Sequence, residues 1–432
     1  MQNIDIIQKS LDYIEENLKA EFHVSELADA AGYSLFHYYR IFQKLVGIPV
    51  MQYITRRKLL HAAFEISKGI KIIDAAYAYG FETKAGFYKA FVHEFHCSPS
   101  EYITRHAAKR PYRINLIQEE HIMLSHKKIK EMLIYWNMPN ETVTDFYYAG
   151  SGVRADSQWN VGDSYILKAG TNIAGLEKHI KITNALANQG FNISLPVKTV
   201  EEKDYYWDGE LYYCLENKLT GEPVESSSLY ETGNDFTPRY LGEIIGQMDL
   251  LLAKFDNDFI CNEPNILGKV QNCIPKIKEI ASLPKSFFDD YIAGFSAIYD
   301  NLPKQLIHRN PCPNCFVNAN SSIGITDFEL SERNLRIFDP CYTATAVLSE
   351  NFDRSTQEPE KWFAIFQNII AGYDSVAKLS REEKEAIPYV IFAIQFICVN
   401  YFSSREKYKE LAEINLRMLE WLVENKEHLR IA

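Results

Sequence analysis

One sequence pattern occurs twice between Phe22 and Tyr102, and it constrains the fold more than any other feature of the chain. The copies read SELADAAGYSLFHYYRIFQKLVGIPVMQYI and KIIDAAYAYGFETKAGFYKAFVHEFHCSPSEYI. Each contains a short helix with an Ala-Ala pair, a turn at Gly32 or Gly80, and a second helix that ends before a proline. A glycine suits such a turn because it tolerates positive φ. The pattern predicts a helix-turn-helix, present twice.

The second helix of each copy is predicted to be amphipathic. Ser34 and Thr83 stand where N-cap hydroxyls would begin these helices. Helical spacing predicts core-facing stripes of Leu35, Tyr38, Ile41, Phe42 and Leu45 in the first, and of Phe87, Ala90, Phe91 and Phe95 in the second. The opposite faces carry Arg, Lys and Tyr beside small residues, which suits a major groove. The predicted DNA-contacting residues are Phe36, His37, Tyr39, Arg40, Lys44, Lys84, Ala85, Tyr88 and Lys89.

These motifs, with a predicted connecting helix from Pro49 to Ser67 and the ending CSPSEYITRH, resemble the AraC/XylS family of transcription regulators over residues 1–106. Cys97 stands where that family usually has a small residue, which we regard as neutral. The resemblance implies that double-stranded DNA is the partner and that both second helices contact bases. The alternative is a helical bundle with solvated basic residues. Two complete copies at this separation favour the first interpretation.

Length and charge indicate more than one domain. A chain of 432 residues is long for a single domain. Its net charge of −11 would disfavour DNA binding, but this charge is unevenly distributed along the chain. Residues 1–113 hold 15 Lys and Arg against 12 Asp and Glu, a net of +3, which leaves −14 for the remainder. We therefore expect DNA to bind a local basic patch, in a complex that is salt-sensitive. Binding should require both helix-turn-helix units.

The chain shows neither a cationic, apolar leader nor a convincing membrane span. Met1 to Ala20 is predicted to be an amphipathic helix with Ile4, Ile7, Leu11 and Ile14 on one stripe. The longest apolar run, Tyr389 to Phe402, is broken by polar residues and is predicted to be a buried helix. Eight scattered cysteines indicate reduced thiols. We expect a cytoplasmic protein that does not use a membrane.

Strand signals and then helix signals follow a basic linker. FYYAG and SYILKAG are predicted strands, with Asn160, Gly162 and Asp163 in an irregular polar turn between them. A helix is predicted over Ala174–Gln189, and DYYWDGELYYCLEN predicts a hairpin with Asp208-Gly209 as its two-residue turn. From Thr237 onward helices dominate: PRYLGEIIGQMDLLLAKF, Pro284–Asp300, and two long helices between Lys361 and His428.

The stretch LIHRNPCPNCFVNANSSIGITDFELSERNLRIFDP identifies the second part. It looks like the aminoglycoside phosphotransferase and choline kinase-like family over residues 120–430, whose motif is H-[GR]-D-x-x-x-x-N followed by a hairpin and I-D-[FW]. By this resemblance Lys168 matches the phosphate-holding strand lysine, with Glu177 as its helix partner. His308 matches the motif histidine, Asp327 the metal-binding aspartate, and Asp339 a structural aspartate. ATP and Mg²⁺ are the ligands that the family implies.

Two positions depart from that motif. Asn310 stands in the place of the catalytic aspartate, and Cys315 in the place of the second metal ligand. An amide has the shape of a carboxylate but not its basicity, and losing a positioned general base costs about 100-fold to 10,000-fold. Magnesium prefers oxygen ligands to a thiol. We therefore name no catalytic residue, and Asp327 is the one candidate Mg²⁺ ligand.

Each of these residues also has a plainer interpretation. Lys168 could be an ordinary edge-strand lysine, and Glu177 an exposed helix residue. Cys312-Pro-Asn-Cys315 has the spacing of redox and zinc sites, but two unrelated substitutions explain it as well. The aromatic hairpin could form a cage for a cation or simply pack as strands. A complete glycine-rich phosphate loop is missing, since Gly150 and Gly152 do not complete a motif.

The predicted fold is multidomain: an all-α double helix-turn-helix domain followed by an α+β bilobal protein-kinase-like domain. The boundaries are 1–108 for the DNA-binding domain, 109–122 for a linker, 123–222 for the kinase-like N-lobe and 223–432 for the helical C-lobe. We expect a DNA-binding regulator whose kinase-like domain, impaired in catalysis, senses a small-molecule effector bound near Asp327. One alternative is a bifunctional regulator with an active, aminoglycoside-like phosphotransferase. A second is a thiol-responsive regulator that uses Cys312 and Cys315.

Overall fold

The chain forms two compact units of comparable size. The computed structural model describes residues 2–95, 97–106, 111–117, 124–147, 154–255, 262–319, 322–356 and 358–431. The first unit comprises residues 1–148, 152–171 and 196–217, and the second comprises residues 149–151, 172–195 and 218–432. The first unit therefore contains both an all-helical domain and a β-sheet.

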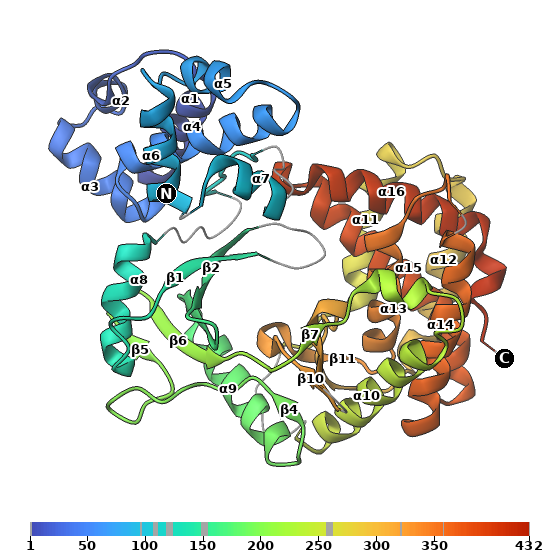
Figure 1. The fold of residues 1–432 in the computed structure, drawn as a ribbon. Coiled ribbons are helices and arrows are strands. Elements are labelled where there is room, and N and C mark those ends of the chain that lie inside the picture. The colour runs from blue at the N-terminus through green and yellow to red at the C-terminus, as the bar shows by residue number, and fades with distance from the viewer. Residues whose placement is uncertain are drawn as a thin grey trace. The chain divides into compact units, whose positions relative to one another are not determined.

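The first unit begins with two helix-turn-helix motifs joined by a longer helix (Figure 1). The motifs are α2–α3 and α5–α6, and α4 connects them. The bounds are α1 (Gln2–Glu16), α2 (Val24–Ala30), α3 (Leu35–Val46), α4 (Val50–Ser67), α5 (Ile72–Ala78), α6 (Lys84–Phe95) and α7 (Pro99–His106). The predicted repeat and the predicted connecting helix are confirmed.

Both tight turns have the backbone that their glycines were predicted to supply. Gly32 has φ 71° and Gly80 has φ 79°, in the left-handed region that glycine enters at little cost. Directly after each turn a hydroxyl caps the next helix. The Ser34 hydroxyl accepts from His37 N at 3.4 Å, and the Thr83 hydroxyl accepts from Gly86 N at 3.0 Å. These local contacts start α3 and α6 in register.

The core of this domain consists of the predicted apolar stripes, with one exception. Tyr38 and Phe42 of α3 and Phe87 and Phe91 of α6 are fully buried, together with Ile7, Leu11 and Ile14 of the α1 stripe, whereas Ile4 of that stripe is half-buried. Leu35 was predicted to face the core, but 42% of its surface is exposed. It is the first residue of α3, and side chains lean toward the N-terminus of their helix, so Leu35 projects beyond the core.

The segment after α7 packs against α1 where it is described. The Gln8 side chain donates to Ile114 O at 2.9 Å and accepts from Leu116 N at 2.8 Å. Arg57 donates to Tyr112 O at 2.6 Å. Ile114 is buried in the helical core. Residues 111–117 of the predicted linker are thus held by the DNA-binding domain, and the rest of the predicted linker lies outside the described residues.

A five-stranded antiparallel sheet completes the first unit. Its strand order is β1-β2-β3-β6-β5, and Trp159, Leu167 and Tyr213 form the centre of its core. The bounds are α8 (His126–Met132), η1 (Leu133–Trp136), β1 (Val143–Tyr147), β2 (Arg154–Val161), β3 (Tyr165–Gly170), β5 (Tyr206–Trp207) and β6 (Tyr212–Asn217).

Two turns in this sheet differ from the prediction. Asn160 was predicted to lie in a polar turn, but it belongs to β2 and pairs with Thr144 and Ile166. The polar side chains on one face of this strand led to the prediction of a turn. On its other face, Trp159 and Val161 are buried. The predicted hairpin is confirmed, but its turn is shifted by one residue. Asp208 N donates to Leu211 O at 3.1 Å, so Gly209 and Glu210 form the turn.

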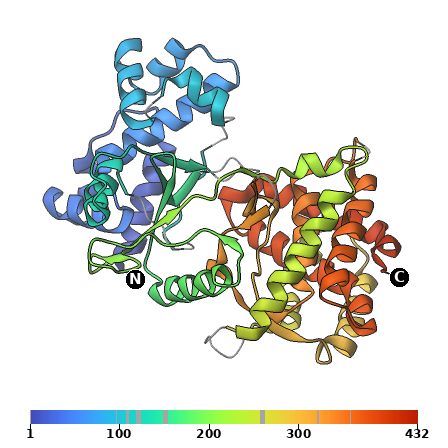
Figure 2. The ribbon, with the colours of Figure 1, turned by 60° about the horizontal axis from the view of Figure 1, so that its bottom comes forward.

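The second unit combines one helix-rich core with two small sheets (Figures 1 and 2). The sheet orders are β4-β10-β9-β7 and β11-β8, and only the β4–β10 pairing is parallel. The helices are α9 (Ile173–Ala187), α10 (Phe236–Leu252), α11 (Ile266–Ile280), α12 (Lys285–Tyr299), α13 (Phe338–Asn351), α14 (Glu358–Val376), α15 (Arg381–Ser403) and α16 (Lys409–Glu424). The strands are β4 (Asn192–Ile193), β7 (Glu222–Pro223), β8 (Lys304–Ile307), β9 (Phe316–Ala319), β10 (Ser322–Ile325) and β11 (Glu332–Leu335). Short 3₁₀ turns are η2 (Ser226–Tyr230), η3 (Ala253–Phe255), η4 (Pro313–Cys315), η5 (Phe328–Leu330), η6 (Glu406–Tyr408) and η7 (Lys426–Leu429).

The C-terminal third has three long helices, not the two that were predicted between Lys361 and His428. They are α14, α15 and α16. Among the described helices, α15 alone is long and apolar enough to cross a membrane by length and composition, and 56% of its apolar window is buried within the protein. Val390, Ile394 and Phe396 of α15 belong to the helical core of this unit. This burial agrees with the predicted buried helix.

Candidate functional site

The outer face of α3 carries the first group of predicted DNA contacts. All five of these residues are exposed, and Phe36 is the most open large apolar side chain on this helix, at 73%. The Arg40 guanidinium lies 6.0 Å from the centre of the Phe36 ring, a cation–π contact that keeps Arg40 along the outer face. A charged, aromatic and unpacked helix face is suited to contact base edges and phosphates.

The outer face of α6 carries the second group. Lys84, Ala85 and Lys89 are exposed, whereas Tyr88 is half-buried and packs at the edge of the core. The Lys84 ammonium lies 5.7 Å from the centre of the Tyr88 ring. The two helix-turn-helix motifs thus present the same combination of cation and aromatic ring on equivalent helices.

An acidic residue of the sheet lies close to one of these cations. Lys44 Nζ is 4.0 Å from Glu210 Oε1, in the turn between β5 and β6. Both side chains are well exposed, so the pair contributes little to stability. The pair nevertheless gives Lys44 an acidic neighbour within the same unit, and a DNA phosphate would compete with that neighbour.

A buried ionic cluster joins the DNA-binding domain to the sheet. Arg56 of α4 contacts Glu94 Oε1 of α6 at 2.7 Å and Asp145 Oδ2 of β1 at 3.3 Å. His126 of α8 and Arg154 of β2 contact the other oxygen of Asp145, at 2.9 and 3.0 Å. Burial alone would raise the pKa of Asp145, but Arg154 and Arg56 hold it well below its usual range. The carboxylate therefore stays ionised and ties four elements together.

This cluster was not predicted from the sequence, although each member left a weak signal there. Arg56 interrupts the apolar spacing of α4, and Glu94 lies between the core residues Phe91 and Phe95. A charge inside an apolar pattern indicates a buried partner. The identity of that partner, 89 residues away in the case of Asp145, is not encoded locally.

The kinase-like loop of the second unit is organised around His308. This histidine is fully buried, its Nε2 lies 2.9 Å from Thr326 O, and its Nδ1 accepts from Asn310 N at 3.4 Å. Burial lowers the pKa of His308 to about 4. The ring is therefore neutral at pH 7, with its proton on Nε2, and it fixes the strand before Asp327 against the loop that carries Asn310.

Asp339 holds the same loop from the other side. Its carboxylate accepts from the backbone N–H groups of His308 and Arg309, both at 2.8 Å. The charge of Asp339 also acts on the buried Asp249 of α10, whose Oδ2 accepts from the Tyr373 hydroxyl at 2.9 Å. Burial raises the pKa of Asp339 to about 7 and, with the charge of Asp339, raises that of Asp249 well above its usual range. The raised pKa of Asp249 keeps this buried carboxyl group protonated at neutral pH.

Two residues of the loop region adopt left-handed backbone conformations that non-glycine residues rarely enter. Arg309 has φ 77° and Asp327 has φ 76°. Such conformations cost about 1–3 kcal/mol each and concentrate at functional sites. Asn310 and Asp327 are half-buried, and Cys315 is buried. The loop that carries the predicted pocket residues therefore has a specific, strained backbone conformation.

These side chains do not form a suitable Mg²⁺ site of the kinase type. Asp327 offers a carboxylate, but Cys315 presents a buried thiol, whose sulfur contacts Cys312 and the Asn310 carbonyl. Mg²⁺ requires oxygen ligands in near-octahedral geometry. Among the described residues, no three His, Cys, Asp or Glu side chains converge in a way that could hold a metal ion.

Lys168 lies in the middle of the five-stranded sheet. It is on β3, between β2 and β6, and only 6% exposed, so the edge-strand interpretation is wrong. Its ammonium lies 3.4 Å from Glu216 Oε2 of β6. A buried lysine is retained when it is paired, and Glu216 supplies that charge within the first unit. Glu177 lies on α9, in the second unit.

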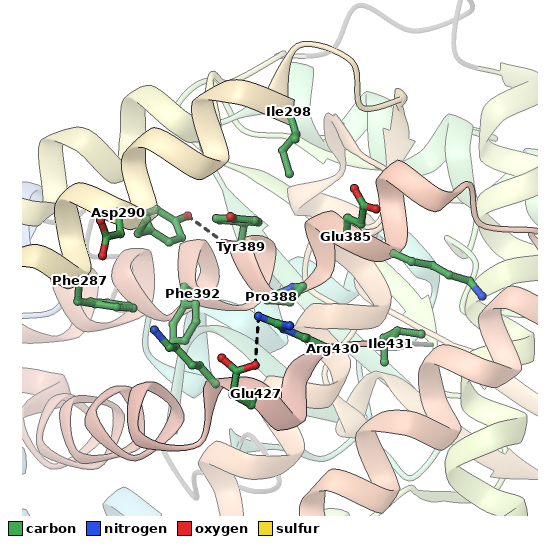
Figure 3. A pocket seen from close by; sticks show the side chains of 13 residues that line it. Phe287, Asp290, Ile298, Glu385, Pro388, Tyr389, Phe392, Glu427, Arg430 and Ile431 are labelled. Atoms are coloured by element: carbon green, nitrogen blue, oxygen red, sulfur yellow. Dashed lines mark hydrogen bonds and ion pairs between the residues drawn. The ribbon is translucent and has the colours of Figure 1, made fainter.

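A separate pocket of about 500 Å³ opens in the second unit among α12, α15 and η7 (Figure 3). Its aromatic wall consists of Phe287, Tyr291, Tyr389 and Phe392. Tyr291 donates to the Tyr389 carbonyl at 3.0 Å, and charged groups such as the Arg430–Glu427 pair lie at the rim. Its size and lining are those of small-molecule sites. None of the six ligand-pocket residues predicted from the sequence lines it.

The fold and these surfaces define a double helix-turn-helix DNA-binding protein fused to a kinase-like domain. Residues 27–105 match the family described as a helix-turn-helix domain. The chain is 37% identical over 98 residues to the HTH-type transcriptional activator AarP of Providencia stuartii, covering 22% of this chain and 73% of that protein. It is 32% identical over 97 residues to the multiple antibiotic resistance protein MarA of Salmonella typhimurium, covering 22% and 76%. Through this domain the chain belongs to the AraC-type family of transcription regulators.

Two solved structures establish the fold of the larger part. The amicoumacin kinase hAmiN, in complex with AMP-PNP, Ca²⁺ and Ami, aligns with a TM-score of 0.53 and 15% identity, covering 70% of this chain and 94% of that chain. The GDP complex of wild-type aminoglycoside 2'-phosphotransferase-IIIa aligns with a TM-score of 0.51 and 13% identity, covering 70% and 99%. The predicted combination of an AraC-type domain with an aminoglycoside phosphotransferase-like fold is confirmed.

Proposed function

We propose that this chain regulates transcription by binding duplex DNA through α3 and α6, and that its kinase-like domain senses a small molecule without transferring phosphate. The observation that carries the proposal is the pair Asn310 and Cys315, at the two positions where phosphoryl transfer needs a base and a metal ligand. The loop that carries them is still held in place by hydrogen bonds of His308 and Asp339.

The loop conformation is retained although the general base is replaced by Asn310, and this combination favours ligand binding over catalysis. A positioned aspartate supports phosphoryl transfer by taking a proton from the attacking hydroxyl, and Asn310 has no basicity to do so. Two costly left-handed residues, Arg309 and Asp327, persist beside it. Retained strain without the catalytic group is consistent with a loop that is kept to bind a ligand.

The buried cluster around Asp145 supports transmission of a signal to DNA. Arg56 is bonded both to β1 of the kinase-like sheet and to Glu94 of α6, the second recognition helix. A ligand that changes the arrangement of the sheet would act on α6 through these bonds. It can do so only to the extent that its affinity differs between the two arrangements.

Phosphotransfer is tested by repairing the loop. Purified protein and the Asn310→Asp, Cys315→Asn double variant are each incubated with ATP, Mg²⁺ and candidate hydroxylated compounds, including aminoglycosides. We expect ATP turnover in the repaired variant to exceed that of the natural chain by about 100-fold or more, the usual cost of a missing general base. Equal turnover would contradict the sensor proposal and favour an active phosphotransferase.

An active phosphotransferase remains the second candidate function. Lys168 is buried in an ion pair within the kinase-like sheet, and the aligned hAmiN structure holds AMP-PNP, Ca²⁺ and Ami. An ATP and Mg²⁺ site is part of that candidate. The same turnover assay decides between the two functions.

DNA binding is tested by genome-wide enrichment. Chromatin precipitated with the tagged full-length protein should be enriched in discrete loci, and the enrichment should be lost when both Arg40 and Lys89 are replaced by alanine. Absence of any enriched locus with the natural protein would overturn the regulator proposal. A thermal-shift screen of nucleotides and antibiotics then seeks the effector, since a ligand that binds only the folded form raises Tm.

A further inference from the structure

Cys312 and Cys315 meet because of the turn that separates them. Pro313 begins the 3₁₀ turn η4, and Cys315 N donates to Cys312 O at 2.9 Å. In a 3₁₀ turn, residues three apart in the sequence are eclipsed, so their side chains lie one above the other. The two sulfur atoms are 3.1 Å apart.

The backbone of this turn already suits a covalent link. One 3₁₀ turn separates residues i and i+3 by about 6 Å along its axis. Disulfides span Cα distances of roughly 4.4–6.8 Å and have sulfur atoms about 2.05 Å apart. The sulfur atoms therefore need to approach by only about 1 Å, which small changes in side-chain torsion provide.

The surroundings disfavour a zinc site as the reason for this pair. Structural zinc takes four nitrogen or sulfur ligands. Among the described residues, no third His, Cys, Asp or Glu joins the two thiols in a metal-binding arrangement. Both cysteines are in the reduced form. The pair is thus a dithiol whose available chemistry is oxidation.

We propose that Cys312 and Cys315 are a modification site at which hydrogen peroxide oxidises the dithiol to a disulfide. The sulfur of Cys312 attacks the peroxide, giving a sulfenic acid and releasing one water. The sulfur of Cys315 then attacks the Cys312 sulfur, the S–S bond forms, and a second water leaves. The dithiol loses two electrons and two protons, and the peroxide is reduced to two waters.

The two thiols are placed for these different roles. Cys312 is half-buried and reaches the surface, whereas Cys315 is buried. The hydrogen bond with Cys312, together with burial, raises the pKa of the Cys315 thiol well above its usual value. Because the thiolate is the reactive form, Cys312 meets the oxidant first and Cys315 resolves the product.

Oxidation would alter the loop in which the effector is proposed to bind. The Asn310 carbonyl accepts from Cys312 N at 2.8 Å and from the Cys315 thiol at 3.5 Å. Thr326 N, next to Asp327, donates to Cys315 O at 3.0 Å. A disulfide removes the thiol donor and draws the two sides of the turn together, so Asn310 and Asp327 are the residues most directly affected. This consequence rests on the proposed sensor function, whereas the disulfide itself does not.

The test is peroxide titration of the full-length protein followed by alkylation and peptide mass spectrometry. Cleavage after Arg309 and Arg333 places both cysteines on one peptide. With increasing hydrogen peroxide, this peptide should lose both alkylation sites together and lose the mass of two hydrogens, and dithiothreitol should restore it. Cys97, a half-buried cysteine of the DNA-binding domain, serves as the control from outside the Cys312–Cys315 pair, and its alkylation should not change in step with that of the paired peptide.

Single substitutions refine the assignment. In Cys315→Ser, Cys312 should accumulate a sulfenic acid that dimedone traps, and in Cys312→Ser, Cys315 should react at least 10-fold more slowly. The proposal is overturned if the natural protein never forms the paired peptide, or if Cys312 proceeds to sulfinic acid while Cys315 stays alkylated. DNA binding of the reduced protein is measured separately, so failure of the disulfide and failure of the regulator proposal are distinguishable.

Discussion

Arg56 Nη2 lies 3.3 Å from Asp145 Oδ2, and this buried ion pair joins the DNA-binding domain to the first strand of the kinase-like sheet. The chain reaches Asp145 from Arg56 through 89 residues that include α5, α6, α7 and α8. Both side chains are almost fully buried, at 6% exposure. The helix-turn-helix domain is therefore packed against its neighbouring sheet by a charged contact, and substitutions in that contact should affect both.

Asp145→Asn should destabilise the first unit by about 3–5 kcal/mol. The substitution leaves Arg56, Arg154 and His126 buried without their shared carboxylate, and a buried charge that loses its partner typically costs this much. Urea denaturation followed by circular dichroism measures the change. Arg113→Ala is the matched control, because its ion pair with Glu16 is exposed and should contribute less than about 1 kcal/mol. Equal effects of the two variants would contradict the role of the cluster.

Arg40→Ala should weaken discrimination at one base pair by about 1–3 kcal/mol, since Arg40 is exposed on the outer face of α3. Fluorescence anisotropy with the preferred operator and single-base variants measures this loss. Arg381→Ala removes an arginine that is also exposed, but in the second unit, and should leave the affinity unchanged. Unchanged operator binding in Arg40→Ala would show that this residue does not contact a base.

Asp249→Asn should become more stable relative to the natural protein as pH rises above about 4. The buried Asp249 keeps its proton because burial and Asp339 raise its pKa, whereas in the unfolded chain it ionises near its ordinary value of 3.8. The folded state then binds more protons than the unfolded state, so stability falls with rising pH by up to about 1.4 kcal/mol per pH unit. Asparagine does not titrate and avoids this loss.

Urea denaturation of both proteins between pH 5 and 8 measures that difference. Comparing the two proteins cancels the contribution of His308, whose lowered pKa has the opposite effect in part of this range. Asp374→Asn is the control of opposite sign, since backbone and lysine contacts lower the pKa of Asp374 against the effect of its burial. Measured over a lower range, from about pH 3 to 5, that variant should lose stability relative to the natural protein as pH rises toward 4, and its difference should be constant between pH 5 and 8. A pH-independent difference for Asp249→Asn would mean that Asp249 does not keep its proton in the folded protein.

Gly372→Ala should destabilise the second unit by about 1–3 kcal/mol or more. Helices α10 and α14 cross closely, and a Cβ at Gly372 would overlap the Arg239 carbonyl oxygen, so the backbones would have to separate. Thermal denaturation measures the loss. Gly268→Ala is the matched control, because a Cβ in the first turn of α11 would meet only ordinary contacts at 3.4 Å and beyond. A neutral Gly372→Ala would show that the crossing is looser than the structure indicates.

The sequence allowed the local features to be predicted because short-range physics determines them. Gly32 and Gly80 were predicted to adopt positive φ, and Ser34 and Thr83 to cap helices, since each depends on residues within three or four positions. The errors arose where neighbours in space decide. Strand β2 was missed because one of its faces is polar, and Leu35 was misplaced because a helix start lies beyond the core.

Residue identity and spacing along the chain were enough to predict a paired DNA-binding motif followed by a kinase-like domain. The resemblance of the loop sequence to phosphotransferases also predicts that Asn310 and Cys315 stand in the places of a catalytic aspartate and a metal ligand. Three contacts could be found only from the packed structure: Arg56 with Asp145, the burial of Asp249 near Asp339, and the approach of the sulfur atoms of Cys312 and Cys315. Burial and the choice of ion-pair partner depend on which surfaces pack together. Packing brings together residues that are far apart in the sequence, and the local sequence around each of them does not indicate its partner.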